Sequence, residues 1–156
     1  MDSSNVQENH DVVQRFFARG GSVRMLGEIE QADLNTLYAH ANQLFNAGEV
    51  EAARNFYTLL SRLDHWNFDY WFALGLSYQR LSDHEAAIYC FSRSGMIRID
   101  DPRSSYFAGV SYRAVDNEAY AAKSFKAAIA WCGDQPVYAG MRLNAEQLMA
   151  QRGVKK

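Results

Sequence analysis

Residues 71–91, in the middle of the chain, read WFALGLSYQRLSDHEAAIYCF. Apolar and small residues recur at the spacing of one helix face before Ser82, and again after Asp83. Serine and aspartate are typical of turns and of helix N-caps. The pattern predicts a hairpin of two helices, over residues 68–81 and 84–97.

Four columns of residues repeat around this hairpin at one constant interval. They are Ala41/Gly75/Gly109, Ala53/Ala87/Ala121, Tyr57/Phe91/Phe125 and Leu44/Tyr78/Tyr112. This interval with these residue types is the tetratricopeptide signature. Three repeats are therefore expected, at 34–67, 68–101 and 102–135. Small residues let the two helices of a hairpin approach closely, and the aromatic rings are expected to wedge between successive hairpins.

We predict an all-α protein in which three tetratricopeptide hairpins form a superhelix, with an N-terminal helical arm and a C-terminal capping helix. Helices are expected at 33–47, 49–62, 68–81, 84–97, 103–115, 118–131 and 136–151. Gly48 should end the first of these helices as its C′ residue, while Pro102 and Pro136 should each stand in the first turn of a new helix. The expected organisation is an arm at 1–32, partly flexible, a repeat domain at 33–151 with a cap at 136–151, and a flexible tail at 152–156.

Composition narrows the class of protein. Hydrophobic residues make up 48% of the 156 residues, which excludes a wholly disordered chain. The 16 basic and 18 acidic residues nearly balance, so no nucleic-acid partner is expected. Neither a long uncharged apolar run nor a secretory signal is readable. We expect a cytosolic protein that does not insert directly into a membrane.

The reactive residue types do not form a catalytic pattern. Cys90 and Cys132 lie far apart in the sequence, each in an apolar helical stretch, so we interpret both as small core residues. The four histidines are scattered, and none of the common nucleophile, metal or phosphate motifs is present. We therefore expect no catalytic residue, no metal site and no cofactor, and we do not expect an enzyme.

The first helix of each hairpin should line the inside of the curved stack. Side chains about a quarter-turn from the small columns should then point into a groove; they are Tyr38, Asn42, Phe45, Phe72, Leu76, Gln79, Tyr106, Val110 and Arg113. Most are apolar, and exposed apolar surface marks interaction sites. Two interpretations stay open: a groove for an extended peptide with apolar anchors, or a trough covered by the arm or the capping helix. Aromatic residues at 38 and 72 argue against a cationic clamp for acidic C-terminal tails.

The N-terminal arm carries an apolar pattern of its own. Phe16 and Phe17 lie on one side of a short helix expected at 11–19, and Val23 and Leu26 form a second apolar group. Such a segment must dock somewhere. It either packs on the first hairpin or contacts a partner subunit, and the second alternative would make it a dimer contact.

Three short segments outside the repeat columns are similar to segments of a known protein family. They are GGSVRML at 20–26, LDHW at 63–66 and DDPR at 100–103. With the repeats, they resemble the class II chaperones of bacterial type III secretion, the low-calcium-response-protein-H-like chaperones that serve the two hydrophobic pore-forming translocators. The resemblance covers the chain from about Phe16 to Met149.

The resemblance implies a function. Such a chaperone would hold an extended N-terminal segment of a hydrophobic translocator in its groove, prevent aggregation or premature association, and keep the translocator competent for export. Tyr38, Phe45, Phe72, Leu76 and Tyr106 would form the pocket walls, and Asn42, Gln79 and Arg113 would satisfy backbone groups of the bound strand. The resemblance also implies a homodimer and, as in some members of the family, a transcription regulator as a further partner. The alternative is a generic tetratricopeptide adaptor for another secretion-system or assembly component.

Overall fold

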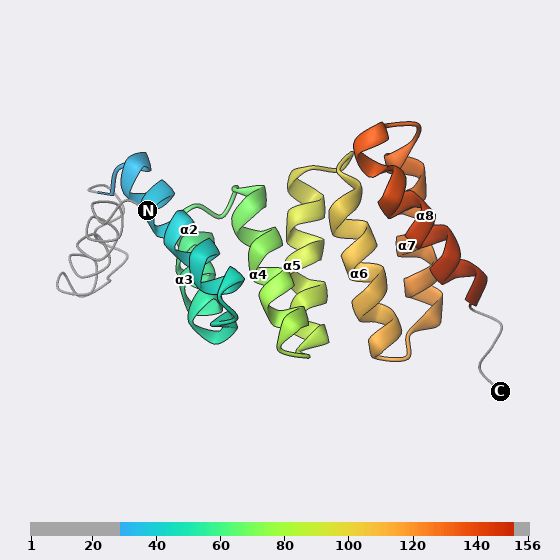
Figure 1. Cartoon of the computed structure of the whole chain (residues 1–156), viewed down its shortest axis with the longest axis horizontal. Helices are drawn as coiled ribbons and strands as arrows, with labels where there is room; N and C mark the ends of the chain where they lie inside the picture. The colour runs from blue at the N-terminus through green and yellow to red at the C-terminus, as the bar shows by residue number, and fades with distance from the viewer. Residues whose placement is uncertain (1–28, 152–156) are drawn as a thin grey trace. The chain divides into compact units, whose positions relative to one another are not determined.

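The computed structural model describes residues 29–151, and every regular element in that range is helical (Figure 1). The helices are α2 (Gln31–Asn46), α3 (Val50–Leu63), α4 (Phe68–Arg80), α5 (His84–Ile97), α6 (Pro102–Ala114), α7 (Glu118–Cys132), the short 3₁₀ helix η2 (Pro136–Tyr138) and α8 (Ala139–Ala150). Helix α2 packs on α3, α4 on α5 and α6 on α7, which confirms the three predicted hairpins. The chain divides into two compact units after His65, with α2 and α3 in the first and α4 to α8 in the second.

The small residues of the repeat allow close contact between the helices of a hairpin. A Cβ added at Gly75 would lie 2.6 Å from Cε1 of Phe91, and one at Gly109 would lie 2.7 Å from Cε1 of Phe125. Both rings are fully buried. A ring of the second helix thus fills the space that a side chain on the first helix would need. In the second unit the rings also reach the next hairpin, because Phe91 stacks on Phe107 with centroids 6.0 Å apart.

The first helix of every hairpin ends in the same way. Gly48, Ser82 and Asp116, which occupy equivalent positions of the three repeats, have φ values of 86°, 62° and 59°. In each case the N–H of the following residue donates to a carbonyl in the last turn of the helix, as Asp83 does to Tyr78 at 2.9 Å. These bonds form the Schellman motif, which closes a helix through one left-handed residue. The predicted role of Gly48 is confirmed.

Side-chain caps begin α4, α5, α6 and α7 in the second unit, whereas η2 and α8 begin without one. The side chain of Asn67 accepts from the N–H of Tyr70, and Asp83, Asp101 and Asn117 accept in the same way at the starts of α5, α6 and α7. A polar cap satisfies one of the N–H groups that the first turn leaves without a helical partner. Pro102 occupies the first turn of α6, where its missing N–H costs nothing.

The predicted last helix is two elements instead of one. Pro136–Tyr138 form η2, in which Tyr138 N–H donates to Gln135 at 3.0 Å and Ala139 N–H donates to Pro136. These bonds have the tighter 3₁₀ spacing. The α-helix begins only at Ala139, so the predicted start at 136 is wrong by one turn.

Both cysteines lie in the core, as expected. Cys90 and Cys132 are buried and do not form a disulfide. Burial raises the pKa of the Cys90 thiol to about 12, and it also raises the pKa of Cys132. Thiols in such surroundings are structural rather than reactive.

Candidate peptide-binding groove

One column of predicted groove residues has the same contact in every hairpin. Tyr38 lies on Tyr57, Phe72 on Phe91 and Tyr106 on Phe125, with ring centroids 6.1, 5.9 and 6.1 Å apart. The groove ring of the first helix thus rests on the buried ring of the second helix. Tyr38, Phe72 and Tyr106 are all half-buried. Each of the three rings contacts a buried ring on one side and keeps part of its surface accessible to solvent.

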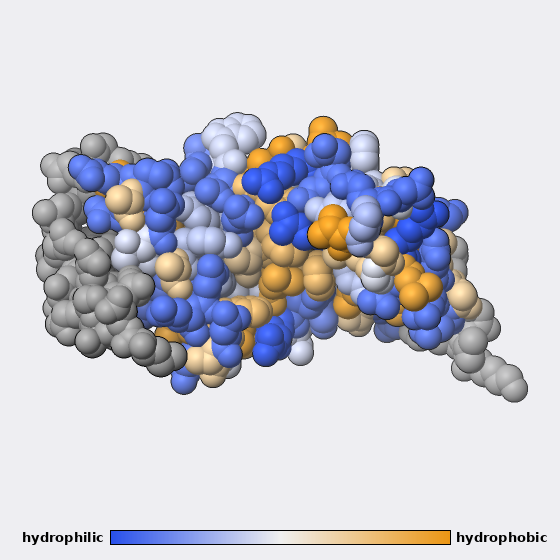
Figure 2. Space-filling view, turned by 45° about the horizontal axis from the view of Figure 1, so that its top comes forward, coloured by the Kyte–Doolittle hydropathy of each residue, from blue (hydrophilic) through white to orange (hydrophobic). Residues whose placement is uncertain are grey.

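The predicted apolar residues of the second unit pack on two buried clusters. Phe72 and Leu76 pack against the buried cluster of Ala87, Phe91 and Ala108. Tyr106 and Val110 pack against a second cluster, formed by Ala121, Phe125 and Ala145. Figure 2 shows hydrophobic surface gathered over the region of α4, α5 and α6, between hydrophilic side chains. The predicted residues of α2, which are Tyr38, Asn42 and Phe45, lie in the first unit.

Sequence reasoning missed Phe107. Its ring meets Phe72 at 5.6 Å and Tyr106 at 5.0 Å, so it links the groove residues of α4 and α6. The signal was available in the repeat register, because the equivalent residues of the first two repeats are Ala39 and Ala73. A ring in a column of alanines indicates that the space between two hairpins is filled differently there.

The predicted polar residues already have partners within the chain. Asn42 accepts from the Tyr57 hydroxyl at 2.5 Å through Oδ1. Gln79 donates from Nε2 to the Phe107 carbonyl at 3.0 Å and to the Ser111 hydroxyl at 2.7 Å. These bonds fix the orientation of each amide side chain. They use Oδ1 of Asn42 and Nε2 of Gln79, and they do not involve Nδ2 of Asn42 or Oε1 of Gln79.

Arg113 has a structural task that the sequence did not show. It pairs with Glu118 through Nε and Nη2, at 2.9 and 3.1 Å, and it donates from Nη1 to the Leu148 carbonyl at 2.7 Å. A cation near the last carbonyls of a helix is favourable because these carbonyls carry partial negative charge. Arg113 therefore attaches the end of α8 to the third hairpin, and all three of its nitrogens take part.

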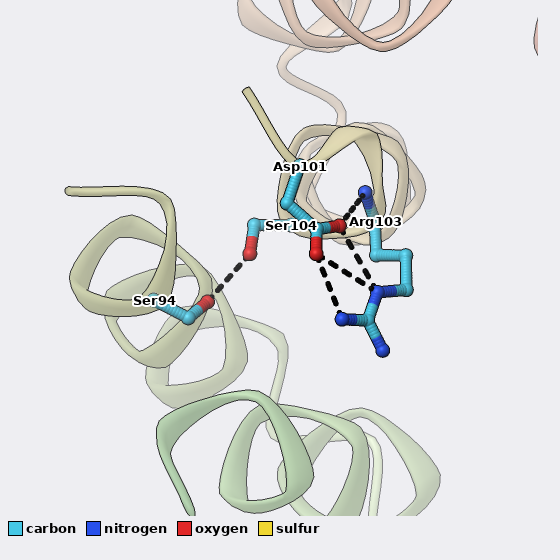
Figure 3. Close-up of polar contacts among 4 residues, drawn as sticks. All are labelled: Ser94, Asp101, Arg103 and Ser104. Atoms are coloured by element: carbon cyan, nitrogen blue, oxygen red, sulfur yellow. Dashed lines mark hydrogen bonds and ion pairs between the residues drawn. The ribbon is translucent and has the colours of Figure 1, made fainter. Parts of the chain in front are cut away.

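A charged rim lies beside the aromatic residues of α4. Asp101 holds Arg103 through two oxygens, the shortest distance being 2.7 Å from Nη2 to Oδ2, and Figure 3 shows the third nitrogen pointing away from Asp101. The guanidinium lies over Phe68 and Phe72 at 4.8 and 5.1 Å. Burial opposes the ionisation of Asp101, but the hydrogen bonds and charge of Arg103 outweigh it and lower the pKa of this carboxyl.

The same junction brings α5 and α6 close together. The buried hydroxyls of Ser94 and Ser104 are hydrogen-bonded at 2.6 Å (Figure 3). Gly95 stands beside them, and a Cβ there would make an ordinary contact of 3.6 Å with Ser104. Small residues at this point set the spacing between the hairpins that carry Phe72 and Tyr106.

The predicted dimer contact of the arm cannot be compared with the structure, and a pocket lies apart from the predicted groove residues. Phe16, Phe17, Val23 and Leu26 of the arm lie outside residues 29–151, so their contacts are not described. A pocket of about 380 Å³ lies between the end of α7 and α8, away from the groove residues. Within residues 29–151, no cluster of His, Cys, Asp or Glu could hold a metal ion. No helix in the described range is both long and apolar enough to cross a membrane.

Comparison with known proteins finds similar sequences. The tetratricopeptide repeat family matches residues 34–67. The low calcium response locus protein H of Yersinia pestis is 28% identical over 107 residues, which are 69% of this chain and 64% of that protein, slightly under two thirds of its length.

Solved structures extend the likeness to most of the chain. The translocator chaperone SycD of Yersinia enterocolitica has a TM-score of 0.78 at 20% identity, over 81% of this chain and 96% of that one. PcrH, solved in complex with the chaperone binding region of PopB, has a TM-score of 0.74 at 25% identity, over 77% of this chain and 97% of that one. The chain is thus similar in sequence to the low calcium response locus protein H and similar in fold to the translocator chaperone SycD and to PcrH.

Proposed function

We propose that this protein is a chaperone of the bacterial cytoplasm that binds an extended segment of a hydrophobic type III secretion translocator along its groove. The observation that carries the proposal is the half-buried aromatic surface of α4 and α6, in which Phe107 contacts both Phe72 and Tyr106. Its likeness to PcrH, which was solved with the chaperone binding region of PopB, supports the same assignment.

The mechanism is binding without catalysis. Leu76 and the ring of Phe72 rest on buried residues and are therefore held in place before a ligand arrives. A preformed surface loses little conformational entropy on binding, whereas the extended client loses much. The affinity is then moderate, and the client can be released for export. Covering its apolar segment prevents aggregation and premature association in the meantime.

The groove assignment keeps all nine predicted residues but gives them different roles. Tyr38, Phe45, Phe72, Leu76, Tyr106 and Val110 supply apolar contacts for spaced side chains of the client. Asn42 and Gln79 offer Nδ2 and Oε1 to its backbone, since their other polar atoms are held by Tyr57, Phe107 and Ser111. Arg113 contributes by holding α8 in place.

Co-expression with a translocator from the same bacterium tests the proposal. The wild-type chain should yield a soluble complex, and the double substitution Tyr38→Glu with Phe72→Glu should abolish it. Phe72 and Leu76 both pack on the core. Leu76→Ala introduces no charge and therefore provides a milder variant, and circular dichroism checks that each variant is folded. Tyr89→Glu is the matched control, because Tyr89 is an exposed ring on α5. A complex that survives both groove substitutions would rule out the groove, and capture of a different assembly component would indicate a generic adaptor.

A further inference from the structure

An arginine on α5 lies on an aromatic ring and has no acidic partner. The guanidinium of Arg93 lies 5.2 Å from the ring centroid of Trp71, which belongs to α4 and also meets the ring of Tyr89 edge-on at 6.1 Å. Nε of Arg93 is buried, and no acceptor among residues 29–151 reaches it. No carboxylate in that range pairs with the guanidinium either. The described part of the chain therefore leaves the positive charge of Arg93 without a partner.

Packing alone does not explain an arginine at this position. At the interval of the repeats, the equivalent residues are Leu59 and Ala127. A buried polar atom without a hydrogen-bond partner lowers stability, and an apolar side chain avoids that loss. The contact with Trp71 offsets part of it, since a cation over an indole ring is favourable. What the arginine adds is a pair of amino groups, Nη1 and Nη2, that have no acceptor among the described residues.

Helix α7 adds two lysines on the corresponding face. Helices α5 and α7 are the second helices of consecutive hairpins (Figure 1). By the interval of the repeats, Lys123 and Lys126 occupy the positions of Tyr89 and Ser92, which lie one turn and one residue before Arg93. Both lysines are exposed, and neither forms an ion pair with another described residue. We call Arg93, Lys123 and Lys126 the basic face.

The charge on these two helices is not balanced within them. Helices α5 and α7 carry two acidic residues, Glu85 and Glu118. Glu118 holds Arg113 of α6 at 2.9 Å and is therefore already neutralised. Glu85 stands in the first turn of α5, about two turns before Arg93. The basic face thus has three cations against one remaining carboxylate, and its polar groups are all hydrogen-bond donors.

We propose that the basic face binds a carboxylate-rich segment of a partner protein. The planar fork of a guanidinium matches the two oxygens of a carboxylate, and the two lysines add point charges for further acidic residues. Aromatic rings hold two of the cations in place, because Nζ of Lys123 lies 5.0 Å from the ring centroid of Tyr120 as Arg93 lies over Trp71. A phosphate backbone is a poorer fit, because three cations are few and the whole chain has more acidic than basic residues. None of the three cations belongs to the groove, so this inference does not rest on the proposed function.

Fluorescence anisotropy of a labelled poly-glutamate peptide, titrated with the full chain at low salt, tests the proposal. The wild-type chain should bind the peptide, and added salt should weaken the complex because it screens the charges. Arg93→Gln should raise the dissociation constant about tenfold, and Arg93→Lys should recover only part of that loss, since lysine lacks the fork. Arg98→Gln is the matched control, because Arg98 is exposed beyond the end of α5 and also lies over a ring, that of Phe68 at 4.6 Å. It should leave the dissociation constant unchanged.

Further variants separate this site from a loss of folding and from the groove. Lys123→Gln with Lys126→Gln removes two exposed charges and should weaken peptide binding about fivefold, with an unchanged circular dichroism spectrum. Leu76→Ala, which alters the groove, should leave peptide binding unchanged. Tyr89→Glu should do the reverse, because it places a negative charge one turn from Arg93 and yet leaves the translocator complex intact. The two sites can thus fail independently.

A wild-type chain that does not bind the peptide at low salt overturns the proposal. So does equal weakening by Arg93→Gln and Arg98→Gln, since the peptide would then respond only to overall charge. Weakening by Leu76→Ala would place the peptide in the groove and also refute the basic face. Tighter binding of a short DNA duplex or of anionic phospholipid vesicles, lost in the same variants, would assign the face to phosphate groups instead.

Discussion

Replacing Gly75 by alanine should destabilise the protein, although alanine is the better helix former. Alanine in a helix interior is favoured over glycine by about 0.8–1.0 kcal/mol. The new methyl group, however, would lie 2.6, 2.8 and 3.0 Å from three atoms of the Phe91 ring. That ring is 1% exposed and cannot swing away. Overpacking a core costs about 1–3 kcal/mol, and a contact this short belongs in the upper part of the range, so we expect a net loss of about 1–2 kcal/mol.

Urea denaturation followed by circular dichroism measures this difference. Gly140→Ala is the matched control, because the same substitution in α8 meets no atom within 4 Å. It should stabilise the chain by up to about 1 kcal/mol, so the two variants should differ by about 2–3 kcal/mol. Phe91→Leu should cost less in the Gly75→Ala background than in the wild type, because the smaller side chain relieves the clash. If Gly75→Ala unfolded at the same urea concentration as Gly140→Ala, the close contact between α4 and α5 would not be what selects glycine here.

Three further predictions concern a helix end, an ion pair and the cysteines. Ser82→Gly should raise the free energy of unfolding by about 1 kcal/mol, because Ser82 holds a φ of 62°, and Gly48→Ser should lower it; thermal denaturation of both variants checks the sign. Asp101→Asn keeps a capping side chain but removes the charge opposite Arg103, so it should cost up to about 1 kcal/mol at pH 7. The pKa of Asp101 is lowered in the folded state, so the difference in free energy of unfolding between the wild type and Asp101→Asn should persist above about pH 4. It should disappear as the pH falls through the folded-state pKa of Asp101. A difference in unfolding free energy that does not change with pH would contradict the role of the ion pair. Cys90 and Cys132 should react with a thiol reagent at pH 8 only in urea, and rapid labelling of the native protein would mean that α5 or α7 opens readily.

The sequence pattern predicts which aromatic residues of the candidate site share one helix position, but it does not predict the hydrogen-bond partners of the polar residues. The register that places Tyr38, Phe72 and Tyr106 in one column is visible in the sequence, and each has the same aromatic contact in the structure. Arg113 donates to the carbonyl of Leu148 in α8, and Gln79 donates to the carbonyl of Phe107 in the next hairpin. No short-range rule connects residues so far apart, because their proximity depends on how whole helices pack.

The sequence alone determined the all-helical architecture, the three hairpins and the residues that close them. Those features depend on the period of the repeats and on local chemistry. Small residues stand where helices touch, capping residues stand where helices begin, and left-handed residues stand where the first helix of each hairpin ends. Only the tertiary structure decided that Phe107 joins the groove rings, that Arg113 secures α8 and that Arg93 lies over Trp71. The physical reason is that burial and hydrogen-bond partners depend on packing between distant helices, which periodicity alone does not specify.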